Sequence, residues 1–291
     1  MQESLFKKSD ISIPEIQENG ALAPMNHKAK LQRAKGQIGF HLHRQKIEKL
    51  YQSGCAKLML PRTYGDMTEA VLLNTAGGIT GGDRMDVDLT AEASCLMVTT
   101  QTAERLYRSS TKPAKVNVKL TAKSAATLHW LPQETIIFDG AELDRTICVD
   151  MTGDSSCLLA ETLVLGREAM GEEVCRCHFT DNWRLYRDGQ LFHAESLRLT
   201  DRVAEVIATP AGGNAARVLS TIFYAGDDAQ KMAKTVTPAV ENSIAICALS
   251  YWENRLVIRL VGSHAPTARL DINTILSVLR GQPMPRVWQI S

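Results

Sequence analysis

The chain lacks an excess of charge of either sign, because 33 lysine and arginine residues are balanced by 32 aspartate and glutamate residues. A protein that binds nucleic acid or anionic lipid through a basic surface would carry a clear positive excess, so the composition argues against both partners. No apolar run approaches the roughly 20 residues that a membrane-spanning helix needs. Residues 1–20 also lack the apolar stretch of a signal peptide. We therefore expect a cytoplasmic protein without membrane contact.

Cysteine is present, but not in a pattern that indicates a disulfide framework. The seven cysteines are odd in number, follow no secretion signal and show no regular spacing, so we expect reduced thiols. Common catalytic motifs are missing as well, since the chain contains neither G-x-S-x-G nor H-E-x-x-H. Nothing in these patterns requires an enzyme.

Alternation of apolar and polar residues over short runs predicts a mainly β chain with many strands. The expected strands lie at residues 69–73, 85–89, 116–120, 158–165 and, as a pair interrupted by Pro132, 128–138. Two helices are expected in the C-terminal third. The first covers residues 228–240 and is limited by Pro238. The second covers residues 266–280, where Pro266 suits the first turn and Gly281 ends the helix.

The length of 291 residues fits one large β domain or two smaller domains. Residues 1–30 are polar and show little periodicity, and they contain Pro14, Gly20 and Pro24. We expect a mobile N-terminal arm over residues 1–30 and one β-rich domain over residues 31–291.

The clearest local element is a hairpin around Asp188-Gly189, because Asp-Gly between two strand-like runs favours a two-residue turn. Such a turn fixes which residues of the two strands stand opposite each other. The expected pairs are Arg187 with Gln190, Leu185 with Phe192 and Trp183 with Ala194.

Residues 74–84, NTAGGITGGDR, hold four glycines around Ile79-Thr80 and end in Asp83 and Arg84. A phosphate-binding loop would open a helix, but the alternation after Arg84 predicts a strand, and Asp83 would repel phosphate. We interpret the run as a tight connection between strands that places Asp83. Whether the glycines leave room for a passage or only allow close strand packing stays open.

Two patterns resemble fragments of a metal site. Cys175, Cys177 and His178 could contribute to a tetrahedral site, and on a strand the two cysteines would share one face. His41 and His43 also share a face of an expected strand and could bind nickel, copper or zinc. Each pattern supplies only half a site, and we favour the simpler interpretation of a strand face with reduced thiols or solvated imidazoles.

Carboxylates recur in apolar or glycine-rich surroundings, where an unpaired charge would be costly if buried. These residues are Asp83, Glu134, Asp139, Glu161 and Glu195. Each of them could be paired with an arginine or lie on a solvated face. Taken together, they could instead line a water-filled path for a divalent cation, since such ions accept carboxylate and water ligands.

Six strings stand out along the chain in a fixed order: NTAGGITGGDR (74–84), TTQTAERLYRS (99–109), WLPQETIIFDGAEL (130–143), AETLVLGREAMGE (160–172), WRLYRDGQLFHAESLRL (183–199) and PRVWQ (285–289). Together, in this order and spacing, they resemble one family, the urease accessory protein UreD, also called UreH. The resemblance covers about residues 34–289.

The resemblance implies a protein that is not an enzyme and that acts with UreF and the GTPase UreG to deliver Ni(II) to apo-urease. It implies a fold of many strands wound in a β-helix-like or β-sandwich-like arrangement, with about two helices. No cofactor would be tightly bound, and nickel would pass transiently. The acidic residues of an internal passage would be Asp83, Glu161 and Glu195. Arg84 stands where some relatives have glutamate, which removes one acidic group from that wall.

Two alternatives from other classes remain. One is an adaptor that binds UreF and urease without touching metal. The other is a hydrolase or lyase that uses the carboxylate of Asp83 or Glu195. We also expect exposed apolar surface for a partner, with the late helices and the PRVW segment as candidates, although core packing would explain these residues equally well.

Overall fold

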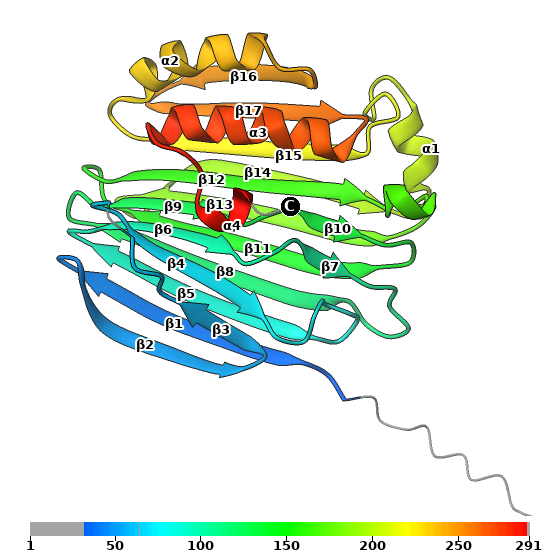
Figure 1. The fold of residues 1–291 in the computed structure, drawn as a ribbon, viewed down its shortest axis with the longest axis horizontal. Coiled ribbons are helices and arrows are strands. Elements are labelled where there is room, and N and C mark those ends of the chain that lie inside the picture. The colour runs from blue at the N-terminus through cyan, green and yellow to red at the C-terminus, as the bar shows by residue number, and fades with distance from the viewer. Residues whose placement is uncertain (1–31, 64, 290–291) are drawn as a thin grey trace, which may run out of the picture. The chain divides into compact units, whose positions relative to one another are not determined.

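The computed structural model of the chain describes residues 32–63 and 65–289 (Figure 1). The expected N-terminal arm, residues 1–30, lies outside these described residues. The described part is built from two β-sheets and a small number of helices. No described helix is long and apolar enough to cross a membrane.

The first sheet has seven strands and a parallel centre. Its order is β14 (Gln190–Thr200), β13 (His178–Arg187), β11 (Glu142–Met151), β8 (Ala114–Lys123), β5 (Arg84–Glu92), β1 (Lys35–His43) and β2 (Lys46–Gly54). The strands from β13 to β1 run parallel, whereas β14 and β2 are antiparallel hairpin partners at the edges.

The second sheet also has a parallel centre, formed by β12, β9, β6 and β4. Its order is β16 (Ile246–Trp252), β17 (Arg255–Gly262), β15 (Val218–Ala225), β12 (Ser156–Leu165), β9 (Thr127–Leu131), β6 (Cys95–Thr100), β4 (Thr68–Asn74) and β3 (Ala56–Met59). The short strands β10 (Thr135–Ile137) and β7 (Glu104–Leu106) extend the sheet beside β12.

Between β4 and β13 the chain passes back and forth between the two sheets, so that it winds as a flattened coil. Thr68, Leu96 and Leu128 stand side by side on successive turns of this coil. The mainly β class and the β-helix-like winding that the family resemblance implied are therefore confirmed. The strands expected from alternation are also present, including the pair at β9 and β10 on either side of Pro132.

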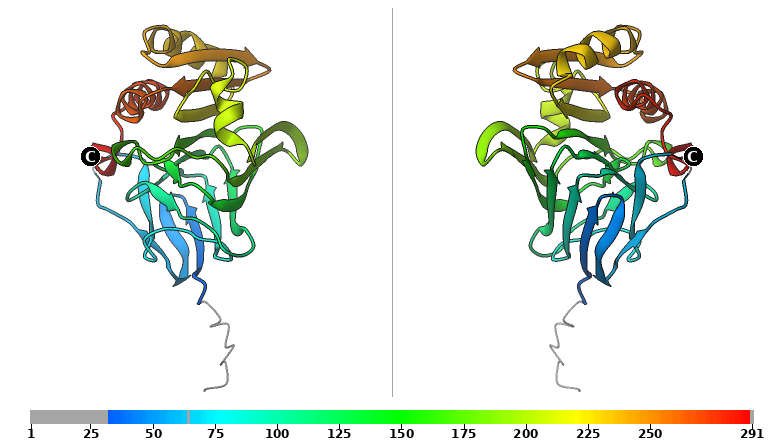
Figure 2. Two further views of the ribbon diagram at one scale, coloured as in Figure 1. Left: turned by 90° about the vertical axis from the view of Figure 1, so that its right-hand side faces the viewer. Right: turned by 90° about the vertical axis from the view of Figure 1, so that its left-hand side faces the viewer.

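The largest core fills the space between the two sheets, where inward residues such as Phe40, Leu89 and Trp183 meet Leu128 and Phe223. A second core lies on the other face of the second sheet. There the apolar sides of α2 (Ala229–Glu241) and α3 (Ala265–Arg280) pack beside each other over β15 and β17 (Figure 2). The layers are thus sheet, sheet and helices.

Both expected helices are confirmed, with Pro238 accommodated near the end of α2 and Gly281 in the left-handed conformation after α3. The sequence did not predict α1 (Val203–Ala208), α4 (Arg286–Gln289) or the 3-10 turn Glu168–Met170. Segments this short do not contain enough residues to show a helical period.

The hairpin around Asp188-Gly189 forms, but its expected register is wrong beyond the first pair. A β-bulge lies opposite the step from Leu185 to Tyr186, where the extra residue Phe192 has no direct partner. Beyond the bulge, Leu185 pairs with His193, Arg184 with Ala194 and Trp183 with Glu195. The ring of Phe192 instead lies under the guanidinium groups of Arg187 and Arg255, at 4.9 and 5.6 Å from its centroid.

The PRVW segment belongs to the core and does not offer Trp288 to a partner. The Trp288 side chain is only 3% exposed, and its indole N–H donates a hydrogen bond of 2.7 Å to the hydroxyl oxygen of Thr99 on β6. Of the two interpretations of this segment, core packing is the correct one for Trp288. Large exposed apolar side chains lie elsewhere, for example Leu270 on α3 and Ile246 on β16.

Candidate functional site

Asp83 is buried at the end of the glycine run, and both of its carboxylate oxygens accept backbone hydrogen bonds. Oδ1 accepts from the amide of Ala34 at 2.8 Å, and Oδ2 accepts from the amide of Thr80 at 2.9 Å. Asp83 therefore ties the loop to the chain that leads into β1. A small cavity of about 10 Å³ lies beside it.

The glycines of this run allow close packing against the segment that contains β7. A Cβ atom on Gly81 would lie 1.9 Å from Oγ of Ser109 and 2.8 Å from the carbonyl oxygen of Lys112. A Cβ atom on Gly78 would lie 2.8 Å from the carbonyl oxygen of Arg105. At these two positions close backbone packing, rather than room for a path, accounts for glycine.

Replacing Gly81 by alanine is expected to lower the free energy of unfolding by about 2 to 3 kcal/mol, because a backbone carbonyl must move to admit the methyl group. Gly77 is the matched control. Unlike Gly81, it has a positive φ of 76°, but a Cβ atom there would meet nothing within 4 Å, so alanine should cost only the backbone strain of about 1 kcal/mol. Urea unfolding measures both values, and equal losses would contradict the packing argument.

Glu104 at the start of β7 is a partly buried acid that the sequence did not single out as a carboxylate of interest. The side-chain amide of Asn74 donates to both of its oxygens at 3.2 Å, which joins the glycine run to the TTQTAERLYRS motif. Burial raises the pKa of Glu104 to about 7. Glu104 therefore changes charge near neutral pH.

The centre of the space between the sheets holds a buried cluster of three charged residues, Arg145, Glu161 and Asp181. Nη1 of Arg145 lies 2.5 Å from Oε2 of Glu161, and Nη2 lies 2.6 Å from Oδ2 of Asp181. The side chains of Arg145, Glu161 and Asp181 are 7%, 3% and 5% exposed. The indole N–H of Trp130 donates to Oε1 of Glu161 at 2.8 Å. We call these three residues the charged triad.

The strand register brings the charged triad together. Arg145 on β11 and Asp181 on β13 are direct neighbours in the first sheet, and Glu161 on β12 belongs to the second sheet. Burial raises the pKa of Glu161, an effect that Arg145 opposes and Asp181 strengthens. Burial disfavours the charge on Arg145, but Asp181 and Glu161 outweigh this and raise its pKa, so its guanidinium stays charged.

A signal for Arg145 and Asp181 was present in the sequence. Arg145 lies in phase with the apolar residues Leu143 and Ile147 of its strand. Asp181 lies in phase with Phe179 and Trp183. A charged residue on the apolar side of an alternating strand indicates a buried ion pair or a site.

Glu195 on β14 lies at the wall of a cavity of about 420 Å³, together with Glu161 and Asp181. Its carboxylate pairs with Arg259 of β17 at 2.6 Å. Two of the three predicted site residues, Glu161 and Glu195, therefore line one cavity, whereas Asp83 does not line it.

Two smaller cavities continue from the charged triad toward the glycine run. One of about 60 Å³ is lined by Arg145, Glu161 and Glu104, and one of about 80 Å³ is lined by Glu104, Asn74 and Gly77. Glu104 lines both small cavities, and Glu161 lines both the 60 Å³ and the 420 Å³ cavity. The acids follow one another in the order Glu104, Glu161, Asp181 and Glu195.

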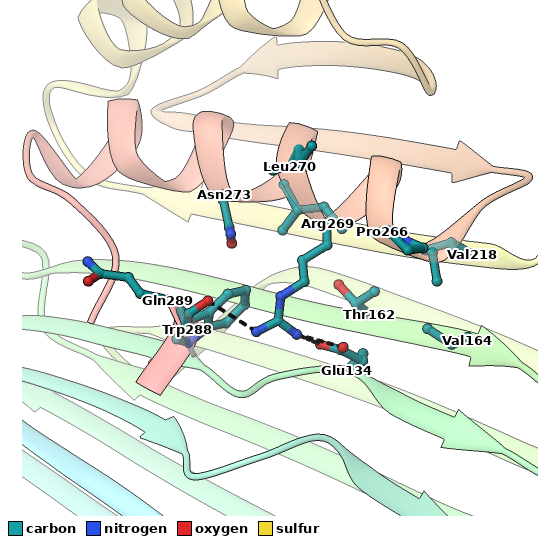
Figure 3. A pocket seen from close by; sticks show the side chains of 12 residues that line it. Glu134, Thr162, Val164, Val218, Pro266, Arg269, Leu270, Asn273, Trp288 and Gln289 are labelled. Carbon is teal, nitrogen blue, oxygen red and sulfur yellow. Dashed lines mark hydrogen bonds and ion pairs between the residues drawn. The ribbon is translucent and has the colours of Figure 1, made fainter. Parts of the chain in front are cut away.

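A larger cavity of about 570 Å³ lies between α3, α4 and the second sheet (Figure 3). Arg269 reaches from α3 into it and pairs with Glu134 at 2.6 Å, and its guanidinium also donates to the backbone oxygen of Trp288 at 3.3 Å. These contacts fasten α3 and α4 to the loop before β10. Asp139 is likewise paired, with Arg108 at 2.9 Å.

The cysteine and histidine patterns do not assemble into metal sites. Strand β13 begins at His178, so the expectation that Cys175 and Cys177 share a strand face is wrong: Cys175 is exposed and Cys177 is buried. Burial raises the pKa of the Cys177 thiol to about 12. The imidazole of His178 pairs with Asp144 at 3.0 Å.

His41 and His43 do share one side of β1, with parallel rings 6.4 Å apart. Their Nδ1 atoms lie 3.2 and 2.7 Å from the carboxylate oxygens of Glu48. Within residues 32–63 and 65–289, no three histidine, cysteine or acidic side chains are arranged to hold a metal ion.

The amino-acid sequence was compared with family models and with curated proteins, and both comparisons support the family that the sequence motifs indicated. The model of the UreD urease accessory protein family matches residues 32–289. The chain belongs to the UreD family. It is 43% identical over 251 residues to a urease accessory protein UreD of Rhizobium leguminosarum bv. viciae, covering 85% of this chain and 90% of the relative. A UreD protein of Chelativorans sp. is 41% identical over 282 residues, covering 94% of this chain and 98% of the relative.

Proposed function

We propose that this chain helps to load nickel into apo-urease, together with UreF and the GTPase UreG, and that it catalyses no reaction itself. In this proposal Ni(II) crosses the space between the two sheets. It passes Glu104 first, then the charged triad, and then Glu195. The observation that supports this route most directly is that Glu104 and Glu161 each line two neighbouring cavities.

The chemistry of the interior suits transfer rather than storage. Nickel is a borderline ion that accepts oxygen ligands, so carboxylates and water can carry it. Transfer requires binding that is favourable enough to admit the ion and weak enough to release it. Glu161 and Glu195 each have an arginine partner within 2.6 Å, which weakens their hold on a cation. Asp83 acts in this proposal by fixing the loop beside Glu104.

Glu161→Gln combined with Glu195→Gln tests the route, because both changes keep side-chain size and remove negative charge. We expect the nickel content and the activity of urease to fall at least about tenfold when this variant is co-expressed with urease, UreF and UreG. Glu134→Gln is the matched control. It removes an arginine-paired carboxylate that lines a different cavity, and nickel delivery should remain normal.

Co-purification of the complex separates the remaining possibilities. If the double variant assembles with its partners and delivers nickel normally, the chain is an adaptor without metal contact. If deleting the chain leaves urease nickel content and activity unchanged, the proposed role in loading is wrong altogether.

A further inference from the structure

Arg145 occupies the position between Glu161 and Asp181 that a cation bound to both carboxylates would take. Its two terminal nitrogens lie 2.5 and 2.6 Å from one oxygen of each acid. The charged triad carries two carboxylates for one guanidinium, so one negative charge is left over when both acids are ionised. A buried arrangement with spare negative charge favours a further positive charge.

The triad also stands where two cavities meet. Arg145 and Glu161 line the cavity of about 60 Å³ on one side. Glu161 and Asp181 line the cavity of about 420 Å³ on the other side. Glu161 lines both cavities and Arg145 lies against its carboxylate, so an ion that crosses along these acids meets the guanidinium of Arg145.

We propose that Arg145 is a tethered cation that closes the interior route, and that a divalent ion crosses by taking its place between Glu161 and Asp181. This inference rests on the proposed function. Because the guanidinium remains attached to β11, it returns when the ion leaves. The site therefore holds the ion only transiently.

The surroundings of Arg145 offer places for the displaced guanidinium. Its central carbon lies 5.5 Å from the ring centroid of Phe179, which can support a cation, and Nη1 lies 3.4 Å from the hydroxyl oxygen of Thr135. Trp130 continues to orient Glu161 through its hydrogen bond to Oε1. In the proposal, the guanidinium shifts away from the acids while Phe179 and Thr135 remain within its reach.

Arg145→Met tests this directly in the purified full-length chain. Methionine, like the stem of arginine, is unbranched and apolar, but it carries no positive charge. Equilibrium dialysis with nickel chloride should show about one additional Ni(II) per chain relative to the wild type, since the buried carboxylates lose their cation. Nickel should also raise the melting temperature of the variant, and Arg145→Met combined with Glu161→Gln should lose both effects. A folded Arg145→Met protein without additional nickel would overturn the proposal.

Arg145→Lys keeps the inference testable if Arg145→Met does not fold. An ammonium group on a shorter chain cannot span both carboxylates as the planar guanidinium does, so it closes the position less well. At limiting nickel, the rate of urease activation with UreF and UreG should increase at least about threefold. Arg269→Lys, which changes the arginine paired with Glu134, should leave this rate unchanged. A folded Arg145→Lys protein with an unchanged or slower rate would overturn the proposal.

The Arg145 variants and the double glutamine variant test different claims, the displacement of Arg145 and the route through the interior. If Glu161→Gln with Glu195→Gln blocks nickel delivery but the Arg145 variants behave like the wild type, nickel uses the interior without displacing Arg145. If the double glutamine variant delivers nickel normally, the route itself is wrong.

Discussion

Replacing Trp288 by alanine is expected to lower the free energy of unfolding by about 3 to 5 kcal/mol, the usual range for removing a large buried aromatic side chain. The indole fills the core between the second sheet and the helices, where Met97 and Leu131 also lie. Arg269 stacks over it at 5.4 Å from the ring centroid, and Thr99 accepts its N–H. Alanine would remove all three contacts and free α4 from the sheet.

Trp288→Phe divides this effect into its parts. Phenylalanine retains most of the apolar contact but leaves the hydroxyl of Thr99 without its partner, so we expect a loss of about 1 to 2 kcal/mol. Urea unfolding followed by circular dichroism measures both variants against the wild type. If alanine is no more destabilising than phenylalanine, Trp288 contributes through its hydrogen bond and not through packing.

Lowering the pH from 6.5 to 5 is expected to remove about 2 kcal/mol of stability through His129 alone. Burial lowers the pKa of this histidine from 6.5 to about 3, and the nearby charge of Arg280 adds to the effect. In this range the unfolded chain binds a proton at His129 and the folded chain does not. Acid therefore favours unfolding, and the loss grows until the pH reaches about 3.

The variant His129→Leu cannot gain a proton, so its free energy of unfolding should fall less than that of the wild type between pH 6.5 and 5.

Glu104 provides a comparison of opposite sign, because its raised pKa of about 7 makes the folded state bind a proton more readily than the unfolded state. Glu104 therefore adds stability at low pH that is lost as the pH rises from about 4.5 to 7. Glu104→Gln should make the loss of stability on acidification larger, and equal pH profiles for all three proteins would contradict both assignments.

Alternation predicted the expected strands, and proline and glycine boundaries predicted the two long helices, because each of these elements is determined by neighbouring residues. The hairpin shows where this reasoning stops: the Asp-Gly turn fixed the first pair, but the bulge places Phe192 against Arg187 of the same hairpin and Arg255 of a distant strand, a contact that the local sequence does not show. The winding could not be derived from alternation, since parallel neighbours such as Leu96 and Leu128 belong to different turns. It came from the family resemblance alone.

The candidate site could be predicted only in part, because the local sequence shows an unusual residue but not the distant residue that it contacts. Glu161 and Glu195 drew notice because each is an acid in an apolar setting, and each has the arginine partner that was the simpler interpretation. Their partners lie on other strands, so local sequence could not identify them. Asp83 differs in that its carboxylate accepts from the backbone amides of Ala34 and Thr80, which come together only when the loop folds.

The coil of alternating strands has a consequence for how the protein can be made. Each turn is completed against the turn before it, so β4 to β13 can form in the order in which a ribosome releases them. The charged triad belongs to this progressive stage, since its residues come from the consecutive strands β11, β12 and β13. The hydrogen bond from Trp288 to Thr99 joins positions 189 residues apart. The C-terminal end of the helical layer can therefore pack against the coil only after the coil has been synthesised.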